Sequence, residues 1–219
     1  MKAGKEFFNL YNHDLVRLAV AIPAVKVADP AFNGEQTLAL IRKAADRKAV
    51  LVLFPELGLS AYTCDDLFQQ RVVLDGCLAA LEKILESTRH LPIVSVVGMP
   101  LEVGHLLFNC AVVISRGRIL GVVPKTYLPG YREFYEVRQF TSGVAAPKDQ
   151  IDLAGQRGIP FGSNIIFKCE EIPDLTFHAE ICEDLWVPIP PSSYAALAGA
   201  TVDGRLVSDL VKQRLAQAG

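Results

Sequence analysis

Apolar residues in the first half of the chain form two kinds of pattern that alternate along it. Short, mainly apolar runs predict β-strands, and a continuous run is typical of a strand covered on both faces. Longer stretches with apolar residues at helical spacing predict amphipathic helices. The predicted strands are 16–22, 50–54 and 92–97, and the predicted helices are 34–48 and 65 to about 89, with Asp65 and Asp66 as caps of the second. This order predicts a layered α/β fold with a mixed sheet.

Hairpin patterns replace this alternation in the second half. The runs 106–114 and 119–123 predict a β-hairpin around the turn Arg116-Gly117-Arg118. The segment 126–139 mixes aromatic and charged residues, which favours a pocket wall. Glycines and prolines in 141–162 predict a long loop, and 164–168 and 175–181 predict two paired strands. A stripe in 205–217 predicts a last helix, with Leu206, Leu210, Val211 and Leu215 on one face.

One cysteine follows the last predicted strand and is our candidate nucleophile. Leu175, Phe177, Ala179 and Ile181 alternate with Thr176, His178, Glu180 and Cys182, so Cys182 is placed where the strand ends. Glu183 and Asp184 oppose formation of a thiolate, so an activating base or cation has to come from elsewhere in the chain. The alternative is a small, buried, inert cysteine.

Composition limits the classes of function. A chain of 219 residues with net charge −2 and 51% hydrophobic residues predicts one globular domain and no nucleic-acid partner. The apolar run 18–25 follows acidic and polar residues, is broken by Pro23 and is too short to span a bilayer, so we expect neither a signal peptide nor a membrane helix. An odd number of cysteines without a C-x-x-C pair predicts no disulfide framework and a reducing, cytoplasmic location; the five are Cys64, Cys77, Cys110, Cys169 and Cys182.

Two charged residues also follow strands and complete a candidate catalytic set. Glu56 comes after the run 50–54 and Lys125 after the run 119–123, each directly behind a proline. A carboxylate can take the proton of Cys182, the sulfur can attack an amide carbon, and an ammonium can stabilise the oxyanion. We also expect Lys125 to lower the pKa of the thiol. The alternative is that both residues are surface charges.

Three sequence blocks carry a resemblance to a known family. They are FPELGLSAY at 54–62, PKTYLPGYREFYE at 124–136 and ICEDLWVP at 181–188. In this order they resemble the nitrilase (carbon–nitrogen hydrolase) superfamily, and within it the glutaminase domain of glutamine-dependent NAD⁺ synthetase. The similarity extends from near the N-terminus to about Val202.

The resemblance implies a fold and a set of site residues. The fold would be a nitrilase-like αββα sandwich with mixed sheets, shortened at its C-terminal end. Glutamine would be split to glutamate and ammonia through a thioester, with no metal or cofactor. By the resemblance, Glu56 is the general base, Lys125 the oxyanion stabiliser, Cys182 the nucleophile and Glu136 the residue that orients the lysine, while Tyr62, Tyr131, Phe134 and Glu183 bind glutamine.

Domain organisation and partners follow from the same resemblance. Residues 1–202 would form an incomplete amidohydrolase domain, and 203–219 a tail that does not align with the family. Ammonia would pass to a separate synthetase domain or subunit that uses ATP and deamido-NAD⁺ and is not found in this sequence. The shortened end also predicts exposed apolar surface, onto which the tail or a second copy docks, and therefore a homo-oligomer.

Two other functions fit parts of the pattern. His178, Glu180 and Cys182 alternate on one strand face and could share a metal ion, although one extended strand seldom supplies three ligands. A non-catalytic binding or assembly module derived from the same domain is the second. Release of ammonia from glutamine distinguishes the amidohydrolase from both.

Overall fold

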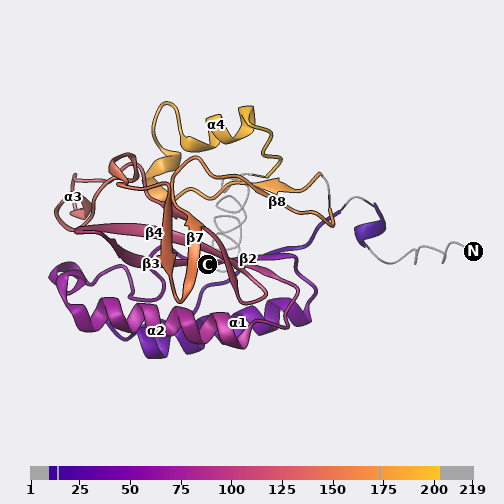
Figure 1. Ribbon diagram of the computed structural model, residues 1–219, viewed down its shortest axis with the longest axis horizontal. Helices are drawn as coiled ribbons and strands as arrows, with labels where there is room; N and C mark the ends of the chain where they lie inside the picture. Colours follow the sequence, from indigo (N-terminus) through magenta and orange to yellow (C-terminus); the bar gives the residue numbers. More distant parts are fainter. Residues whose placement is uncertain (1–9, 14, 173, 203–219) are drawn as a thin grey trace, which may run out of the picture.

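The computed structural model describes residues 10–13, 15–172 and 174–202, and they form three layers (Figure 1). Two long helices, α1 (Pro30–Asp46) and α2 (Arg71–Ser87), lie side by side on one face of a five-stranded sheet. The short pair β8 (Phe167–Lys168) and β9 (Thr176–Phe177) lies over the other face, with α4 (Pro191–Leu197) outside it. The predicted α/β fold is confirmed.

The central sheet is mixed, as predicted. Its strands β1 (Leu18–Val20), β2 (Leu51–Leu53), β3 (Val94–Val103), β4 (Leu106–Ser115) and β5 (Arg118–Pro124) follow one another in space as in sequence. The first three are parallel and the last three antiparallel. Ser115 pairs with Arg118, so a two-residue turn joins β4 to β5. Arg116 and Gly117 both have positive φ, as the tight turns of β-hairpins require.

Neighbouring residues of the sheet point into different cores. Val52 and Val97 pack with the two helices in the larger core, whereas Leu51 and Val96 pack beneath β8 and β9. A strand that is buried on both faces needs apolar residues at every position, which explains the continuous runs in the sequence. The helices approach closely at Gly34, where a Cβ atom would lie 2.9 Å from the Cβ of Ala80.

The predicted helix from 65 to about 89 is wrong in its first turn. Residues Asp65–Gln69 form a 3₁₀ helix, η2, and α2 begins only at Arg71. Asp65 has φ of +47°, and Asp66 bonds to Arg138 instead of capping a helix. The first helix also differs, because Pro30 occupies its first turn and Asp29 caps it, so α1 starts ahead of the predicted residue 34.

The long loop predicted over 141–162 is also wrong. This stretch contains the 3₁₀ turn η3 (Gly143–Ala145) and a hairpin of β6 (Gln150–Leu153) and β7 (Gln156–Pro160). The alternating residues Ile151, Leu153 and Ile159 are buried in the larger core, so they supply the apolar contacts that make the hairpin stable.

The predicted pairing of 164–168 with 175–181 is confirmed in shortened form, as β8 and β9. Leu175, Phe177, Ala179 and Ile181 are buried as the alternation predicts, but Thr176 and His178 are buried too. The ladder ends at Phe177, and the turn η4 (Cys182–Leu185) follows the extended segment 178–181. The remaining elements are η1 (Leu10–His13) and α3 (Glu136–Gln139). The helix predicted over 205–217 lies outside the described residues.

Membrane insertion was not expected from the sequence. Within the described ranges, no helix combines the length and apolar character needed to cross a bilayer.

Candidate active site

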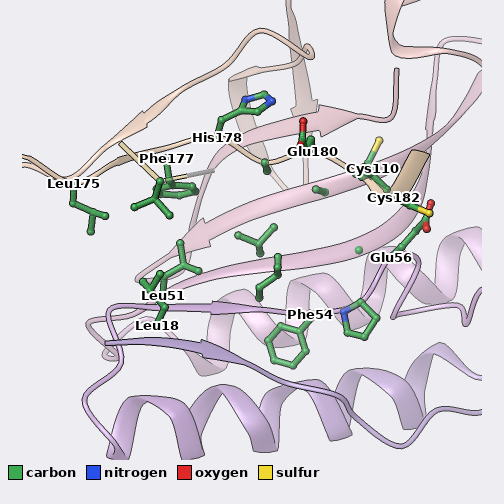
Figure 2. Close-up of a pocket in the computed structure, with 18 residues that line it drawn as sticks. Leu18, Leu51, Phe54, Glu56, Cys110, Leu175, Phe177, His178, Glu180 and Cys182 are labelled. Atoms are coloured by element: carbon green, nitrogen blue, oxygen red, sulfur yellow. The ribbon is translucent and has the colours of Figure 1, made fainter. Parts of the chain in front are cut away.

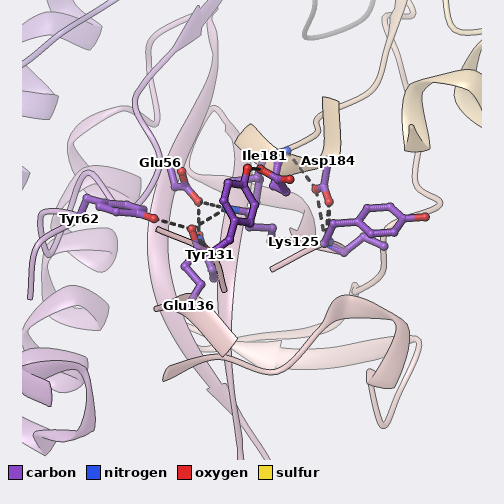
Figure 3. Close-up of polar contacts among 11 residues, drawn as sticks. Glu56, Tyr62, Lys125, Tyr131, Glu136, Ile181 and Asp184 are labelled. Atoms are coloured by element: carbon purple, nitrogen blue, oxygen red, sulfur yellow. Dashed lines mark hydrogen bonds and ion pairs between the residues drawn. The ribbon is translucent and has the colours of Figure 1, made fainter. Parts of the chain in front are cut away.

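Lys125 is the centre of a buried polar cluster (Figure 3). The residue directly follows β5, and its backbone N–H donates to the carbonyl oxygen of Asn109 on β4 at 2.8 Å. Its side chain has no exposed surface, and its Nζ lies 2.7 Å from Oε1 of Glu56 and 2.7 Å from Oε1 of Glu136. A fully buried ammonium has to be paired, and two carboxylates pair it here.

Glu56 reaches this cluster because the turn after β2 rests on a glycine. The turn crosses β3 at Gly98, where a Cβ atom would lie 2.5 Å from the carbonyl oxygen of Pro55 and 2.6 Å from the backbone nitrogen of Leu57. No side chain fits in that space. The backbone N–H of Leu59 donates to the carbonyl of Gly98, which fixes the turn on the sheet.

Two further donors hold the carboxylates. Asn109 Nδ2 donates to Oε1 of Glu56 at 2.6 Å, and the hydroxyl of Tyr62 donates to Oε1 of Glu136 at 2.6 Å. Tyr62 was predicted to line a substrate pocket, and the structure places its hydroxyl on Glu136. Asn109 was missed, although an amide inside the apolar run 106–114 is a signal that could have found it.

Cys182 lies at the mouth of an apolar cavity of about 120 Å³, which Glu56 also lines (Figure 2). Figure 2 shows both side chains at the same end of the cavity. Cys182 is exposed, has φ of +48° and begins η4. Of the other four cysteines, Cys64, Cys77 and Cys110 are buried, and Cys169 is half-buried.

Asp184 bonds the turn η4, which begins with Cys182, to the loop that follows Lys125, and this structural role was not predicted from the sequence. Its Oδ1 accepts from the backbone N–H groups of Thr126 at 3.0 Å and Tyr127 at 2.7 Å, while its Oδ2 accepts from that of Ile181 at 3.2 Å (Figure 3). One carboxylate therefore bonds the segments on either side of the site. Burial raises its pKa to about 6, although these donors oppose the shift.

Lys125 acts to lower the pKa of the Cys182 thiol, as expected, but other contributions outweigh it and the pKa is raised overall. Although the residue is exposed, desolvation of its sulfur and, next, the carboxylate of Glu56 raise that pKa to about 11, and Lys125 only partly opposes them. Two carboxylates already share the charge of Lys125, so little of it is left to stabilise a thiolate. Cys182 is therefore a thiol at rest.

The pKa values of Glu56 and Lys125 are both raised as well. Burial raises the pKa of Glu56, because Lys125 also serves Glu136 and cannot fully compensate. Burial alone would lower the pKa of Lys125, but its ion pairs with Glu56 and Glu136 outweigh burial and raise it. The lysine is thus held as an ammonium. Two of its three N–H groups meet carboxylates, which leaves one for another acceptor.

The remaining predicted binding residues lie beside the nucleophile turn. The hydroxyl of Tyr131 donates to Oε2 of Glu183 at 3.0 Å. The rings of Tyr131 and Phe134 pack edge to face, with their centroids 5.7 Å apart. The predicted pocket wall 126–139 thus lies near Cys182. Its last residues form α3, which begins with Glu136.

The structure does not support the suggestion that His178, Glu180 and Cys182 share a metal ion. His178 Nδ1 lies 2.8 Å from the carbonyl oxygen of Ile165, and Oε2 of Glu180 accepts from the backbone N–H of Ser192. In the part of the chain that the structure describes, no three His, Cys, Asp or Glu residues are grouped closely enough to share an ion.

Comparison of the sequence with known proteins yields consistent relatives. A family profile described as carbon–nitrogen hydrolase matches residues 17–210. A glutamine-dependent NAD(+) synthetase of Mycobacterium tuberculosis is 45% identical over 197 residues, which are 90% of this chain and 29% of that protein. A protein of the same name from Aquifex aeolicus is 31% identical over 186 residues, covering 85% of this chain. The chain thus spans about 29% of the length of these relatives.

Solved structures share the fold. A glutamine-dependent NAD(+) synthetase from Cytophaga hutchinsonii superposes with a TM-score of 0.72 at 23% identity, over 86% of this chain and 30% of that one. An amidase from Nesterenkonia sp. gives a TM-score of 0.63 at 21% identity, over 86% of this chain and 63% of its own. The architecture predicted from the sequence is confirmed at this level.

Proposed function

The chain belongs to the carbon–nitrogen hydrolase family, and from this premise we propose that it hydrolyses the side-chain amide of glutamine to glutamate and ammonia. Cys182 is the nucleophile, Glu56 the general base and Lys125 the oxyanion stabiliser. The observation that carries the proposal is the ammonium of Lys125, buried between Glu56 and Glu136 beside an exposed thiol, with one N–H left for a substrate oxygen.

In the first half of the reaction, Sγ of Cys182 bonds to the amide carbon while its proton passes to Glu56. The carbonyl oxygen gains the negative charge and accepts the remaining N–H of Lys125. Glu56 then gives its proton to the nitrogen, the carbon–nitrogen bond breaks, and ammonia leaves a thioester behind. The raised pKa of Glu56 suits both steps, because a base is most effective with a pKa near the working pH.

In the second half, water replaces the amine. Glu56 takes a proton from the water, whose oxygen bonds to the thioester carbon, and Lys125 again stabilises the oxyanion. The carbon–sulfur bond breaks, the proton returns to the sulfur, and glutamate leaves. Since Cys182 is neutral at rest, proton transfer to Glu56 has to accompany the attack by sulfur.

The same proposal assigns the substrate's other end to the Tyr131–Glu183 pair. The carboxylate of Glu183 is the anionic group that the ammonium of an amino acid requires, and Tyr131 orients it through the 3.0 Å hydrogen bond. The aromatic pair of Tyr131 and Phe134 would cover the aliphatic part of the substrate. Glutamine is preferred over a simple amide for this reason.

The relatives support a proposal about the product. They are named glutamine-dependent NAD(+) synthetases and are more than three times as long as the part matched here. We propose that the ammonia is used by a synthetase domain or subunit, where ATP and deamido-NAD⁺ act, and that the amidase reaction itself needs no cofactor.

Ammonia release from glutamine by the purified chain tests the activity, with asparagine and a simple nitrile beside it. Cys182→Ala should abolish release, and Glu56→Gln should reduce it by about 10²- to 10⁴-fold. A parental chain that binds glutamine but releases no ammonia would contradict the proposal and favour a non-catalytic binding module.

Lys125→Met tests the role of Lys125 as oxyanion stabiliser, and we expect it to lower the stability of the fold as well. Turnover should fall by roughly 10²- to 10³-fold. Because the variant leaves Glu56 and Glu136 buried without their cation, it should also lose about 3–5 kcal/mol of stability. The double variant Lys125→Met/Glu136→Gln should regain part of that stability but no turnover, so thermal unfolding of both variants separates catalysis from folding.

A further inference from the structure

A second cavity, of about 400 Å³, lies between α4 and the loop that follows β5. It includes Thr126, Tyr127, His178, Ile189 and Tyr194, but neither Cys182 nor Glu56. Figure 2 shows the imidazole of His178 pointing away from the apolar side chains of the first cavity. This volume is within the range of cavities that hold small organic molecules.

Two residues that line this second cavity each have a buried polar atom without a partner. Among the described residues, four buried side-chain polar atoms lack a hydrogen bond, and Nε2 of His178 and Oγ1 of Thr126 are two of them. His178 is only 4% exposed. A buried polar atom left unpaired costs stability, so such atoms usually mark the place of a ligand or a water molecule.

The bond on the other ring nitrogen fixes what His178 can accept. Nδ1 lies 2.8 Å from the carbonyl oxygen of Ile165, and a carbonyl can only accept a hydrogen bond. Nδ1 therefore carries the proton, and in the neutral ring Nε2 is left as an acceptor. A ligand that satisfies His178 has to bring an N–H or O–H donor.

The rest of the lining disfavours a charged ligand. No Asp, Glu, Lys or Arg is among the described residues that line the second cavity, and most of its surface is aromatic or aliphatic. A charged ligand would lose its hydration there without an opposite charge to replace it. Tyr127, Tyr194 and Ile189 instead suit a flat apolar body.

We propose that this second cavity is a binding site for an uncharged aromatic molecule whose N–H or O–H donates to Nε2 of His178. Neither Cys182 nor Glu56 lines it, although His178 also lines the first cavity. The site is linked to the proposed active centre through Thr126, which follows Lys125 and whose backbone N–H bonds to Asp184.

Calorimetric titration with indole and 1-methylindole at about pH 8 tests the proposal. The two probes have the same ring system, but only indole has an N–H. Indole should bind saturably and about tenfold more tightly than 1-methylindole, which is the size of one hydrogen bond. Equal affinities, or no saturable binding of indole, would overturn the proposal.

Variants locate the bound probe. His178→Asn keeps a donor for Ile165 but lacks Nε2, so it should bind indole about tenfold more weakly and no longer distinguish the probes. Cys182→Ala should bind indole like the parental chain, and loss of binding there would place the probe in the first cavity and refute the assignment. If His178→Asn does not fold, the ¹⁵N resonance of His178 Nε2 in the parental chain decides, because it should shift with indole and not with 1-methylindole.

Discussion

The charge of Lys125 is divided between two carboxylates, and this division explains the protonation of the residues around it. A lysine facing one nearby thiol would stabilise a thiolate, as in the activated cysteines of many enzymes. Here the two carboxylates, instead of a thiolate, pair with the ammonium, and Cys182 keeps its proton. In the proposed reaction, the sulfur and Glu56 therefore act as a pair.

Alkylation of Cys182 by iodoacetamide should report this state. With a thiol pKa of about 11, the rate should rise roughly tenfold per pH unit from about pH 7 to about pH 10 without a plateau, because the thiolate reacts. Mass spectrometry of the labelled peptides follows it, with buried Cys110 as internal control. A plateau near neutral pH would mean that Lys125 does activate the thiol.

The pH dependence of stability should contain a contribution from Asp184. Burial raises its pKa from 3.8 to about 6, so the folded chain holds this proton more tightly than the unfolded chain. The resulting stability is fully present below about pH 4 and is lost as the pH rises through about 6, by up to roughly 3 kcal/mol.

Asp184→Asn, which cannot titrate, isolates this contribution. The free energy of unfolding in urea, measured at several values between about pH 4 and about pH 7, should fall with rising pH more steeply for the parental chain than for the variant. Parallel curves for the two proteins would show that Asp184 titrates normally.

At the scale of elements, the strand ends and nearby backbone contacts position the groups that we propose as catalytic. Glu56 follows β2 and Lys125 follows β5, and both strands belong to one sheet. The close approach of the Pro55–Leu57 backbone to Gly98 brings the carboxylate over the sheet toward the ammonium. A side chain at position 98 would separate these two elements.

Gly98→Ala should therefore reduce turnover strongly while lowering the stability of the fold only moderately. The added Cβ would meet backbone atoms at 2.5 and 2.6 Å, so the turn that carries Glu56 has to move. A displacement near 1 Å can cost about 10²-fold in rate, while overpacking costs about 1–3 kcal/mol. Ammonia release and urea unfolding measure the two effects.

Gly104→Ala is the matched control for this prediction. Gly104 has φ of +65° with no atom within 4 Å of an added Cβ, so alanine there strains only the local turn. It should leave turnover near the parental value. Equal losses of turnover in both variants would argue against a positioning role of Gly98.

Sequence patterns predicted the elements that have strong periodicity. The runs 50–54 and 106–114 predicted strands correctly because both faces of these strands are buried, and the turn Arg116-Gly117 predicted the hairpin. The hairpin of β6 and β7 was missed because its strands have only four and five residues with few apolar positions. Roles set by distant backbone contacts, such as those of Gly98 and Asp184, leave no periodic signal along the chain.

At the scale of the whole molecule, the described residues cover the two faces of the sheet unequally. Helices α1 and α2 cover the first face of the sheet, whereas the short β8–β9 pair and α4 lie over the second (Figure 1). Large apolar side chains are exposed around α4, including Leu197 at 88%, Tyr194 at 63% and Ile189 at 56%. Such a group on the surface favours association.

The predicted homo-oligomer can be tested at this surface. If the α4 surface joins two copies, light scattering should show a dimer or larger species, and Leu197→Asp should shift it to the monomer. Val72→Asp on α2 is the control, since Val72 is 77% exposed on the other face. A parental monomer would contradict the prediction, as would dissociation by both substitutions alike.

The wide separation of the proposed catalytic groups along the chain has a consequence for biosynthesis. Glu56 and Lys125 are 69 residues apart, and the bond between Thr126 and Asp184 closes a further 58. Strands β3, β4 and β5 pair with neighbours in sequence, so they can fold while later residues are still being added. The thiol of Cys182, by contrast, can approach Glu56 only after the segment through η4 has left the ribosome. Under the proposed function, a growing chain therefore releases no ammonia before the segment through η4 has been synthesised.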